Sequence, residues 1–214
     1  MIKQVLTTIN GPAGSLEAIY QAPNQPHLPH VIVCHPHPLH GGSMHNKVVT
    51  ITANAAHQAG MGTLRFNYRG VGQSEGCYGN IEGEVQDASA VFDWLISHQT
   101  NPIVFCAGFS FGAFVAASLF VDRRAEDLVC IAPSIKNMPF ENLDHAALNG
   151  LVIQGNQDDI VDPIASINWA KKTQLPCVQI HQAGHFFHGQ LIALKEILGK
   201  HWQNKLSELQ LTIE

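Results

Sequence analysis

Short apolar runs alternate along the chain with longer stretches in which apolar residues recur every three or four positions. The runs have the length of strands, and His30–Cys34 is continuously apolar, as in a strand buried on both faces of a parallel sheet. The predicted strands are His30–Cys34, Gly62–Phe66, Ile103–Ala107, Leu128–Ala132, Leu151–Gln154 and Cys177–His181. The predicted helices are Ser43–Ala59, Ile81–His98, a segment that follows Gly112, Asp162–Lys172 and about His188–Leu209. This alternation predicts an α/β protein with a mostly parallel, doubly wound sheet and right-handed crossovers.

Turn and cap residues mark the ends of several elements. Lys3–Asn10 and Ser15–Gln21 flank a Gly/Pro turn and predict an antiparallel hairpin at the start of the chain. Ser43 is the expected N-cap of its helix and Gly60 the expected stop, while Asp162, followed by proline, is the expected N-cap of a later helix. In doubly wound sheets the active site lies at the carboxyl ends of the strands. Functional residues are therefore expected directly after strands.

Length and composition describe an ordinary globular protein. The 214 residues most simply form one domain spanning 1–214, with 45% hydrophobic and 14% charged residues. A net charge of −5 gives no reason to expect a nucleic-acid partner, which a basic patch would recognise. The apolar runs are too short to cross a bilayer, so no membrane association is expected.

Cysteine usage and the first residues bear on the compartment. The segment Met1–Val5 lacks the apolar stretch and small-residue cleavage site of a signal peptide. The five cysteines are odd in number and scattered, without a C-x-x-C pair, and Cys34, Cys106 and Cys130 lie inside apolar runs. A reduced, cytoplasmic protein without structural disulfides is expected.

The segment Gly108-Phe109-Ser110-Phe111-Gly112 has the G-x-S-x-G pattern between a predicted strand and a predicted helix. This is the context of a nucleophile elbow, in which the serine sits on a sharp turn with its Oγ above the sheet. The neighbouring turns crowd the serine, so the flanking positions need to be almost free of side chain. Ser110 is the candidate nucleophile.

A serine nucleophile needs a base and an acid that orients the base. Asp158 and Asp159 both follow the strand Leu151–Gln154, while a third carboxylate, Asp162, is explained by its capping role. His185 follows the last predicted strand and is the candidate base, with His188 as an alternative. The chain order serine, acid, histidine is that of α/β-hydrolases.

An oxyanion hole needs two N–H donors aimed at the developing negative charge. One is expected from Phe111, the residue after the nucleophile. The second is expected from the loop His35–Gly42, which reads HPHPLHGG. Because Pro36 and Pro38 carry no N–H, His37 is the candidate donor by position.

Five blocks of sequence together resemble the compact bacterial α/β-hydrolases grouped with dienelactone hydrolase. They are CHPHPLHGGSMHNKVV, GTLRFNYRGVGQSEG, CAGFSFGAFVA, LVIQGNQDDIV and AGHFFHG. The resemblance implies the α/β-hydrolase fold and a triad of Ser110, Asp158 and His185, and it favours Asp158 over Asp159. Dienelactone hydrolase itself has a cysteine nucleophile where this chain has Ser110, so its dienelactone chemistry is not carried over.

Two further features bear on the substrate. Arg69, in the stretch R-G-x-G-x-S, is expected to be ion-paired and structural, with binding of a substrate anion as the alternative. Only Ser134–Asn149 lies where related folds insert a lid, so no cap domain is expected. Met138, Phe140 and Leu143 of this segment either line an open site or pack on the core. Small or exposed esters are the expected substrates.

Three other functions compete with a serine esterase. His35, His37, His40 and His45 include a His-x-His spacing that a metallohydrolase could use, but zinc sites usually add carboxylate or more distant histidine ligands. A silent α/β-hydrolase could act as a binding protein. A thioesterase, an aminoacyl or peptide hydrolase, or an acyltransferase could use the same triad. The favoured esterase mechanism needs no metal and no organic cofactor, and its expected partner is a small-molecule ester.

Overall fold

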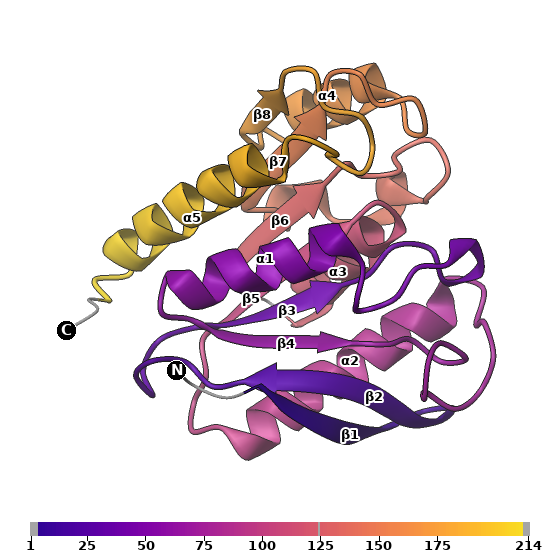
Figure 1. Ribbon diagram of the computed structural model, residues 1–214, viewed down its shortest axis with the longest axis vertical. Coiled ribbons are helices and arrows are strands. Elements are labelled where there is room, and N and C mark those ends of the chain that lie inside the picture. The colour runs from indigo at the N-terminus through magenta and orange to yellow at the C-terminus, as the bar shows by residue number, and fades with distance from the viewer. Residues whose placement is uncertain (1–3, 124, 212–214) are drawn as a thin grey trace.

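A single sheet organises the computed structural model, which describes residues 4–123 and 125–211 (Figure 1). Among these residues eight strands pair in the order β1-β2-β4-β3-β5-β6-β7-β8. Their bounds are β1 Val5–Gly11, β2 Gly14–Gln21, β3 His30–Cys34, β4 Gly62–Phe66, β5 Val104–Phe109, β6 Asp127–Ile131, β7 Gly150–Gly155 and β8 Cys177–Ile180. The pairs β1–β2 and β2–β4 are antiparallel and all other pairs are parallel. The mostly parallel α/β sheet is confirmed, although residue 3 of the expected hairpin lies outside the described residues.

Helices cover both faces of the sheet. Their bounds are α1 Lys47–Gln58, α2 Glu82–His98, α3 Phe111–Arg123, α4 Pro163–Lys172 and α5 Leu191–Glu208, with short 3₁₀ helices η1 Pro38–His40, η2 Phe140–Asn142 and η3 His145–Ala147. In β3, Val31 and Val33 join the core beneath α1 and α5, whereas Ile32 and Cys34 join the core beneath α2, α3 and α4. Both sets are fully buried because successive side chains of a strand point to opposite faces. Figure 1 shows α1 and α5 side by side on one face.

The first helix begins later than its apolar periodicity predicts. Its N-cap is Asn46, whose Oδ1 accepts a hydrogen bond from the N–H of Val48 at 2.9 Å. The Oγ of Ser43 instead accepts from the N–H of His45 at 3.3 Å, within a turn that precedes the helix. The expected N-cap at Ser43 was wrong, because two residues of capping type lie close together and periodicity cannot choose between them.

The last helix also begins later than expected, at Leu191 rather than at His188. Phe187 and Gly189 have positive φ angles of 53° and 76°, which a right-handed helix does not contain. The chain therefore turns sharply on both sides of His188 before α5 begins.

The region where a lid would be inserted holds only short structure. Between β6 and β7 the described chain forms η2 and η3 and no longer helix. Phe140 is buried and packs on Phe114 and Trp169, at ring-centroid distances of 5.2 and 4.8 Å, while Met138 and Leu143 pack against the same core. These side chains therefore pack on the core.

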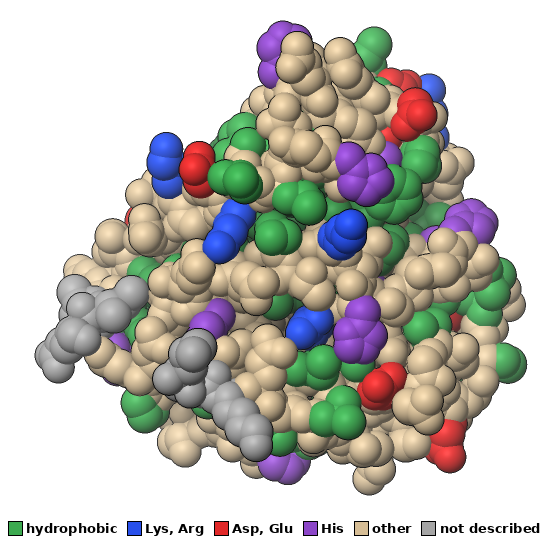
Figure 2. Space-filling view, viewed as in Figure 1, with side chains coloured by type: hydrophobic (Ala, Val, Ile, Leu, Met, Phe, Trp, Pro, Cys, Tyr) green, Lys and Arg blue, Asp and Glu red, His purple; other side chains and the backbone are tan. Residues whose placement is uncertain are grey.

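The helices, the surface charges and the cysteines of the described chain bear on the expectations from the sequence. No helix within the described ranges is both long and apolar enough to cross a membrane. On the face that carries α1 and α5, Lys and Arg side chains stand apart from one another (Figure 2). All five cysteines are free thiols, and burial raises the pKa of Cys34 to about 12.

Candidate active site

Ser110 lies on the turn between β5 and α3, at the carboxyl end of the sheet. Its φ angle is +57°, a left-handed conformation that is uncommon for a residue with a side chain and is found at functional sites. A Cβ placed on Gly108 would lie 1.9 Å from the carbonyl oxygen of Gly112. A Cβ on Gly112 would lie 2.4 Å from the carbonyl oxygens of Cys34 and His35. Both glycines of the G-x-S-x-G pattern are therefore required by close backbone approach.

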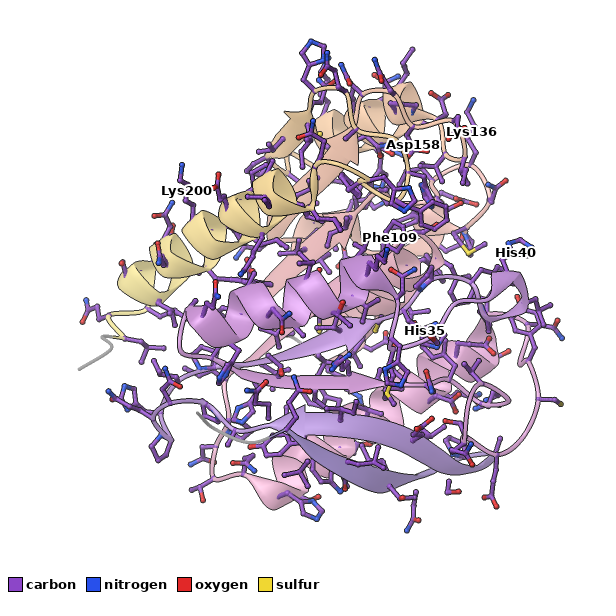
Figure 3. The ribbon with its side chains drawn as sticks, viewed as in Figure 1. His35, His40, Phe109, Lys136, Asp158 and Lys200 are labelled. Atoms are coloured by element: carbon purple, nitrogen blue, oxygen red, sulfur yellow. The ribbon has the colours of Figure 1, made fainter. Side chains whose placement is uncertain are left out.

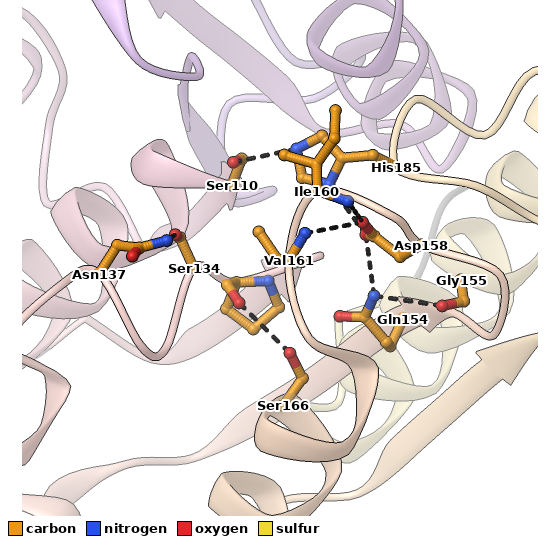
Figure 4. Close-up of polar contacts among 11 residues, drawn as sticks. Ser110, Ser134, Asn137, Gln154, Gly155, Asp158, Ile160, Val161, Ser166 and His185 are labelled. Carbon is orange, nitrogen blue, oxygen red and sulfur yellow. Dashed lines mark hydrogen bonds and ion pairs between the residues drawn. The ribbon is translucent and has the colours of Figure 1, made fainter.

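The structure brings Ser110, His185 and Asp158 into one chain of hydrogen bonds (Figure 4). The Oγ of Ser110 lies 3.1 Å from Nε2 of His185, and Nδ1 of His185 lies 2.8 Å from Oδ2 of Asp158. A proton on Nδ1 donates to Asp158 and leaves Nε2 free to accept from the serine hydroxyl. Asp159 and His188 are both exposed, so they do not take these places.

Asp162 lies apart from this chain of hydrogen bonds. It caps α4, where its Oδ1 accepts from the N–H of Ile164 at 2.9 Å. Its Oδ2 lies 2.6 Å from the ammonium group of Lys136. The capping role expected for Asp162 is confirmed.

The Asp158 carboxylate is buried and fully hydrogen-bonded. Its Oδ1 accepts from the N–H groups of Ile160 and Val161, each at 2.9 Å. Its Oδ2 accepts from His185 and from Nε2 of Gln154, the latter at 3.0 Å. Burial acts to raise the pKa of Asp158, but the hydrogen bonds and the nearby histidine outweigh it and hold the pKa below its usual value.

Backbone hydrogen bonds join the loop that carries Asp158 to the loop that carries His185. The N–H of Gln157 donates to the carbonyl of Ala183 at 2.9 Å, and the N–H of Asn156 donates to the carbonyl of Ile180 at 3.1 Å. The Asn156 side chain in turn accepts from the N–H of Gln182 at 2.8 Å. These hydrogen bonds therefore hold the loops of Asp158 and His185 together.

The buried ring of His35 holds the loop after β3 in place. This ring is completely buried, and burial lowers its pKa to about 3, so it is neutral. Its Nδ1–H donates to the carbonyl of Pro36 at 2.7 Å, and its Nε2 accepts from the N–H of Tyr68 at 3.2 Å. The Tyr68 hydroxyl donates to the carbonyl of His35 at 3.2 Å. His35 and Tyr68 thus fix the path of the loop beside Ser110.

His37 and Phe111, the two candidate oxyanion donors, lie next to each other. Their rings are 4.8 Å apart between centroids. Phe111 is the first residue of α3, where backbone N–H groups have no acceptor within the helix. His37 has a φ of −53° and caps η1, its Nδ1 accepting from the N–H of Leu39 at 3.2 Å. Its ring therefore has a structural partner of its own.

A small pocket of about 200 Å³ opens above Ser110. Its lining residues are Pro36, His37, His40, Gly41, Gly42, Asn46, Ser110, Ile160, His185 and Phe186. None of them is Asp, Glu, Lys or Arg. Two rim side chains, Ile160 and Phe186, are 56% and 40% exposed. The pocket therefore suits a small uncharged group, with apolar surface at its mouth.

The four histidines of the β3–α1 region have different environments. His35 lies inside the fold and His40 at its edge, as Figure 3 shows. The rings of His37 and His40 stack at 4.6 Å, and His45 is exposed. Within residues 4–123 and 125–211, no group of three or more His, Cys, Asp or Glu side chains is placed to hold a metal ion.

Arg69 is ion-paired, as its structural interpretation predicted. Its Nη2 lies 2.7 Å from Oδ1 of Asp87, which is fully buried, and its Nε contacts both carboxylate oxygens. The pair ties the loop after β4 to α2.

Two polar residues beside the site had no role in the sequence-based prediction. Gln154 contacts Asp158, and Tyr68 contacts His35. The signal for Gln154 was available, since it is the polar residue that ends an otherwise apolar strand. Tyr68 carried no such signal, because an aromatic residue after a strand is ordinary in a core.

Known proteins resemble both the sequence and the fold. A family model described as serine aminopeptidase, S33, matches residues 30–147, more than half of the chain. An uncharacterized protein of Rickettsia prowazekii (strain Madrid E) is 37% identical over 193 residues, which cover 83% of this chain and 80% of that protein.

Two solved structures are similar to this chain in sequence and in fold. An α/β serine hydrolase homologue from Coxiella burnetii is 40% identical with a TM-score of 0.87, over 94% of this chain and 97% of that one. A protein from Xanthomonas campestris, described as an α/β serine hydrolase without lid, is 34% identical with a TM-score of 0.87, over 99% and 97%. The predicted α/β-hydrolase resemblance is confirmed, and the protein belongs to this serine aminopeptidase family within the compact, lidless α/β serine hydrolases.

Proposed function

We propose that the protein hydrolyses small or exposed carboxylic esters with Ser110 as nucleophile, His185 as general base and acid, and Asp158 as the orienting acid. The observation that carries this proposal is the continuous hydrogen-bond chain from the Ser110 hydroxyl through His185 to Asp158, beneath an open pocket. The same three groups in the same contacts perform acyl transfer in serine hydrolases on several folds.

In the acylation step, Ser110 Oγ attacks the ester carbonyl carbon while Nε2 of His185 takes the hydroxyl proton. The carbonyl π electrons move onto oxygen, and the N–H groups of Phe111 and His37 stabilise this oxyanion. When the oxyanion collapses, the bond to the alkoxy oxygen breaks and that oxygen takes the proton from His185. An alcohol leaves, and the acyl group stays on Ser110.

Deacylation repeats these steps with water. Nε2 of His185 takes a proton from water as the water oxygen attacks the acyl carbon, and a second oxyanion occupies the same donors. Collapse breaks the bond to Ser110 Oγ, which recovers its proton from His185, and a carboxylic acid leaves. Asp158 accepts from Nδ1–H throughout and stabilises the imidazolium.

Pocket size and chemistry support small uncharged substrates. At about 200 Å³ the pocket is below the range of roughly 300–1,000 Å³ that is usual for drug-sized ligands. A larger alcohol or acyl group would extend past Ile160 and Phe186 into solvent, which the absence of a lid between β6 and β7 of the described chain permits.

The family description makes amino-terminal peptide cleavage the second candidate. A free α-ammonium group needs a carboxylate or several carbonyl oxygens to replace its hydration. Among the described residues no carboxylate lines the pocket, and the Asp158 carboxylate already accepts from four donors. The ester is therefore the better match, while thioesters and acyl acceptors other than water fit the same geometry.

A fluorophosphonate probe tests the nucleophile. We expect intact-mass analysis to show one label on the parent protein and on Ser134→Ala, a control at a buried serine that accepts a hydrogen bond from Asn137. Ser110→Ala should take no label. Labelling that survives in Ser110→Ala would refute the assignment.

A substrate panel tests the preferred bond. Among acetyl, butyryl and palmitoyl esters, thioesters and aminoacyl amides, the short esters should give the highest kcat/KM. A preference for aminoacyl amides would favour the peptidase.

A further inference from the structure

Gln154 is a buried amide inside the sheet, directly beneath the candidate acid. It lies near the carboxyl end of β7 and is 0% exposed. Its Nε2 lies 3.0 Å from Oδ2 of Asp158 and 3.2 Å from the carbonyl oxygen of Gly155. Both partners can only accept, so the amide NH₂ group faces them and the orientation of the side chain is settled by its contacts.

This orientation leaves the other end of the amide without a partner. The Oε1 of Gln154 is buried and accepts no hydrogen bond from any described residue. An unsatisfied buried acceptor is destabilising, and such groups in folded proteins call for a specific explanation. An apolar side chain of similar volume would fill the same space without this cost. Packing alone therefore does not account for a glutamine at this position.

The contact with Asp158 does account for a glutamine at position 154. Two backbone N–H groups hold Oδ1 of Asp158, whereas only side chains contact Oδ2. Gln154 and His185 approach this oxygen together. The Gln154 donor stabilises the negative charge on that oxygen and opposes rotation of the carboxylate away from His185.

We infer that Gln154 is a positioning residue of the triad, which acts through Asp158 to hold its Oδ2 ionised and aimed at Nδ1 of His185. The role rests on the proposed function, because Asp158, the residue that Gln154 contacts, is the proposed acid of the triad. Gln154 itself touches no reacting atom.

Gln154→Met removes the donor and keeps the approximate volume. We expect kcat to fall roughly ten- to a hundredfold, the range that corresponds to losing a hydrogen bond to a charged group. KM should stay within about twofold, because a lost transition-state interaction lowers kcat rather than substrate binding. Gln179→Met is the matched control, since Gln179 pairs with Gln154 across β7 and β8 but is exposed. It should leave kcat and KM unchanged.

Gln154→Glu separates positioning from packing. The new carboxyl group would lie beside the Asp158 carboxylate, and two neighbouring carboxyl groups do not both ionise readily. Near neutral pH the protonated group donates its O–H to Oδ2 and restores much of the activity lost in Gln154→Met. At alkaline pH it loses that proton, so a new descending limb should appear in the kcat profile. A purely structural role would give both variants the pH profile of the parent.

Proton NMR provides a readout that does not depend on turnover. The low-field resonance of the His185 Nδ1–H, identified by its absence in His185→Ala, should shift or broaden in Gln154→Met and stay unchanged in Gln179→Met. If the parent neither hydrolyses esters nor takes the fluorophosphonate label, the proposed function fails while this resonance still tests the contact. An unchanged resonance and pH profile in Gln154→Met and Gln154→Glu, in an active parent, would overturn the inference.

Discussion

At the scale of single residues, the site combines strained and restrained groups. Ser110 adopts a left-handed backbone conformation, and close contacts of Gly108 and Gly112 keep it there. His35 is neutral and buried, so its two ring nitrogens act as one donor and one acceptor that hold the neighbouring loop. His37 is different, because its ring is bound by its own loop and only its backbone N–H is proposed to serve the reaction.

The proposed role of the His37 N–H can be separated from its ring. The φ of −53° is compatible with proline, so His37→Pro removes the N–H with little backbone change, whereas His37→Ala removes only the ring. We expect His37→Pro to lower kcat roughly a hundred- to a thousandfold, as the loss of one oxyanion donor does. His37→Ala should stay within severalfold of the parent in the same ester assay. Equal losses in the two variants would argue against the backbone donor.

At the scale of secondary-structure elements, short loops at the carboxyl ends of β3, β5, β7 and β8 carry the whole site. The loops after β7 and β8 are joined by backbone hydrogen bonds, which hold the candidate acid and the candidate base together. The loop after β3 leads into α1, whose N-cap Asn46 also lines the pocket. The start of α1 therefore contributes both to helix stability and to the wall of the pocket.

Helix capping predicts a difference in stability between two neighbouring residues. Asn46→Ala removes the side chain that accepts from the N–H of Val48, and we expect a loss of about 1 kcal/mol in the free energy of unfolding. Ser43→Ala should cost less than about 0.5 kcal/mol, because Ser43 caps no helix. Urea denaturation of both variants measures the difference. The reverse order would place the helix start at Ser43.

At the scale of the whole molecule, buried histidines couple folding to pH. The pKa of His35 falls to about 3 in the folded protein, against about 6.5 in an unfolded chain. Between these values the unfolded state binds a proton that the folded state does not, so stability decreases as the pH falls below about 6.5. His30, whose pKa burial lowers to about 4, acts in the same direction. Asp158 loses its contribution only at lower pH, since its unfolded pKa is about 3.9.

We therefore expect mild acid to destabilise the protein. Between pH 7 and pH 5 the free energy of unfolding should fall by roughly 2 kcal/mol through His35 alone. His35→Gln cannot titrate, so this variant should be less stable at pH 7 but should show a shallower decline. Urea denaturation at the two pH values provides the measurement. A decline of the same size in parent and variant would exclude His35 as the cause.

The kinds of element and their order could be predicted from the sequence, because hydrophobic periodicity is local. The same holds for the crowding around Ser110, since two glycines in a strand–turn–helix context indicate close backbone approach. The residue at which α1 begins was harder to predict from the sequence. Ser43 and Asn46 are both good caps, and the choice depends on which one reaches a free N–H group after the loop has folded.

Sequence by itself determined the α/β architecture and the placement of the serine, the carboxylates and the histidine after three different strands, because hydrophobic periodicity and side-chain type can be read along the chain. Only the tertiary structure decided that Asp158 and not Asp159 faces His185, since neighbouring carboxylates differ only in the direction in which the folded loop turns them. It also decided that His35 is buried while His45 is exposed, and that Gln154 meets Asp158. These outcomes depend on contacts between segments far apart in sequence, which local pattern does not encode.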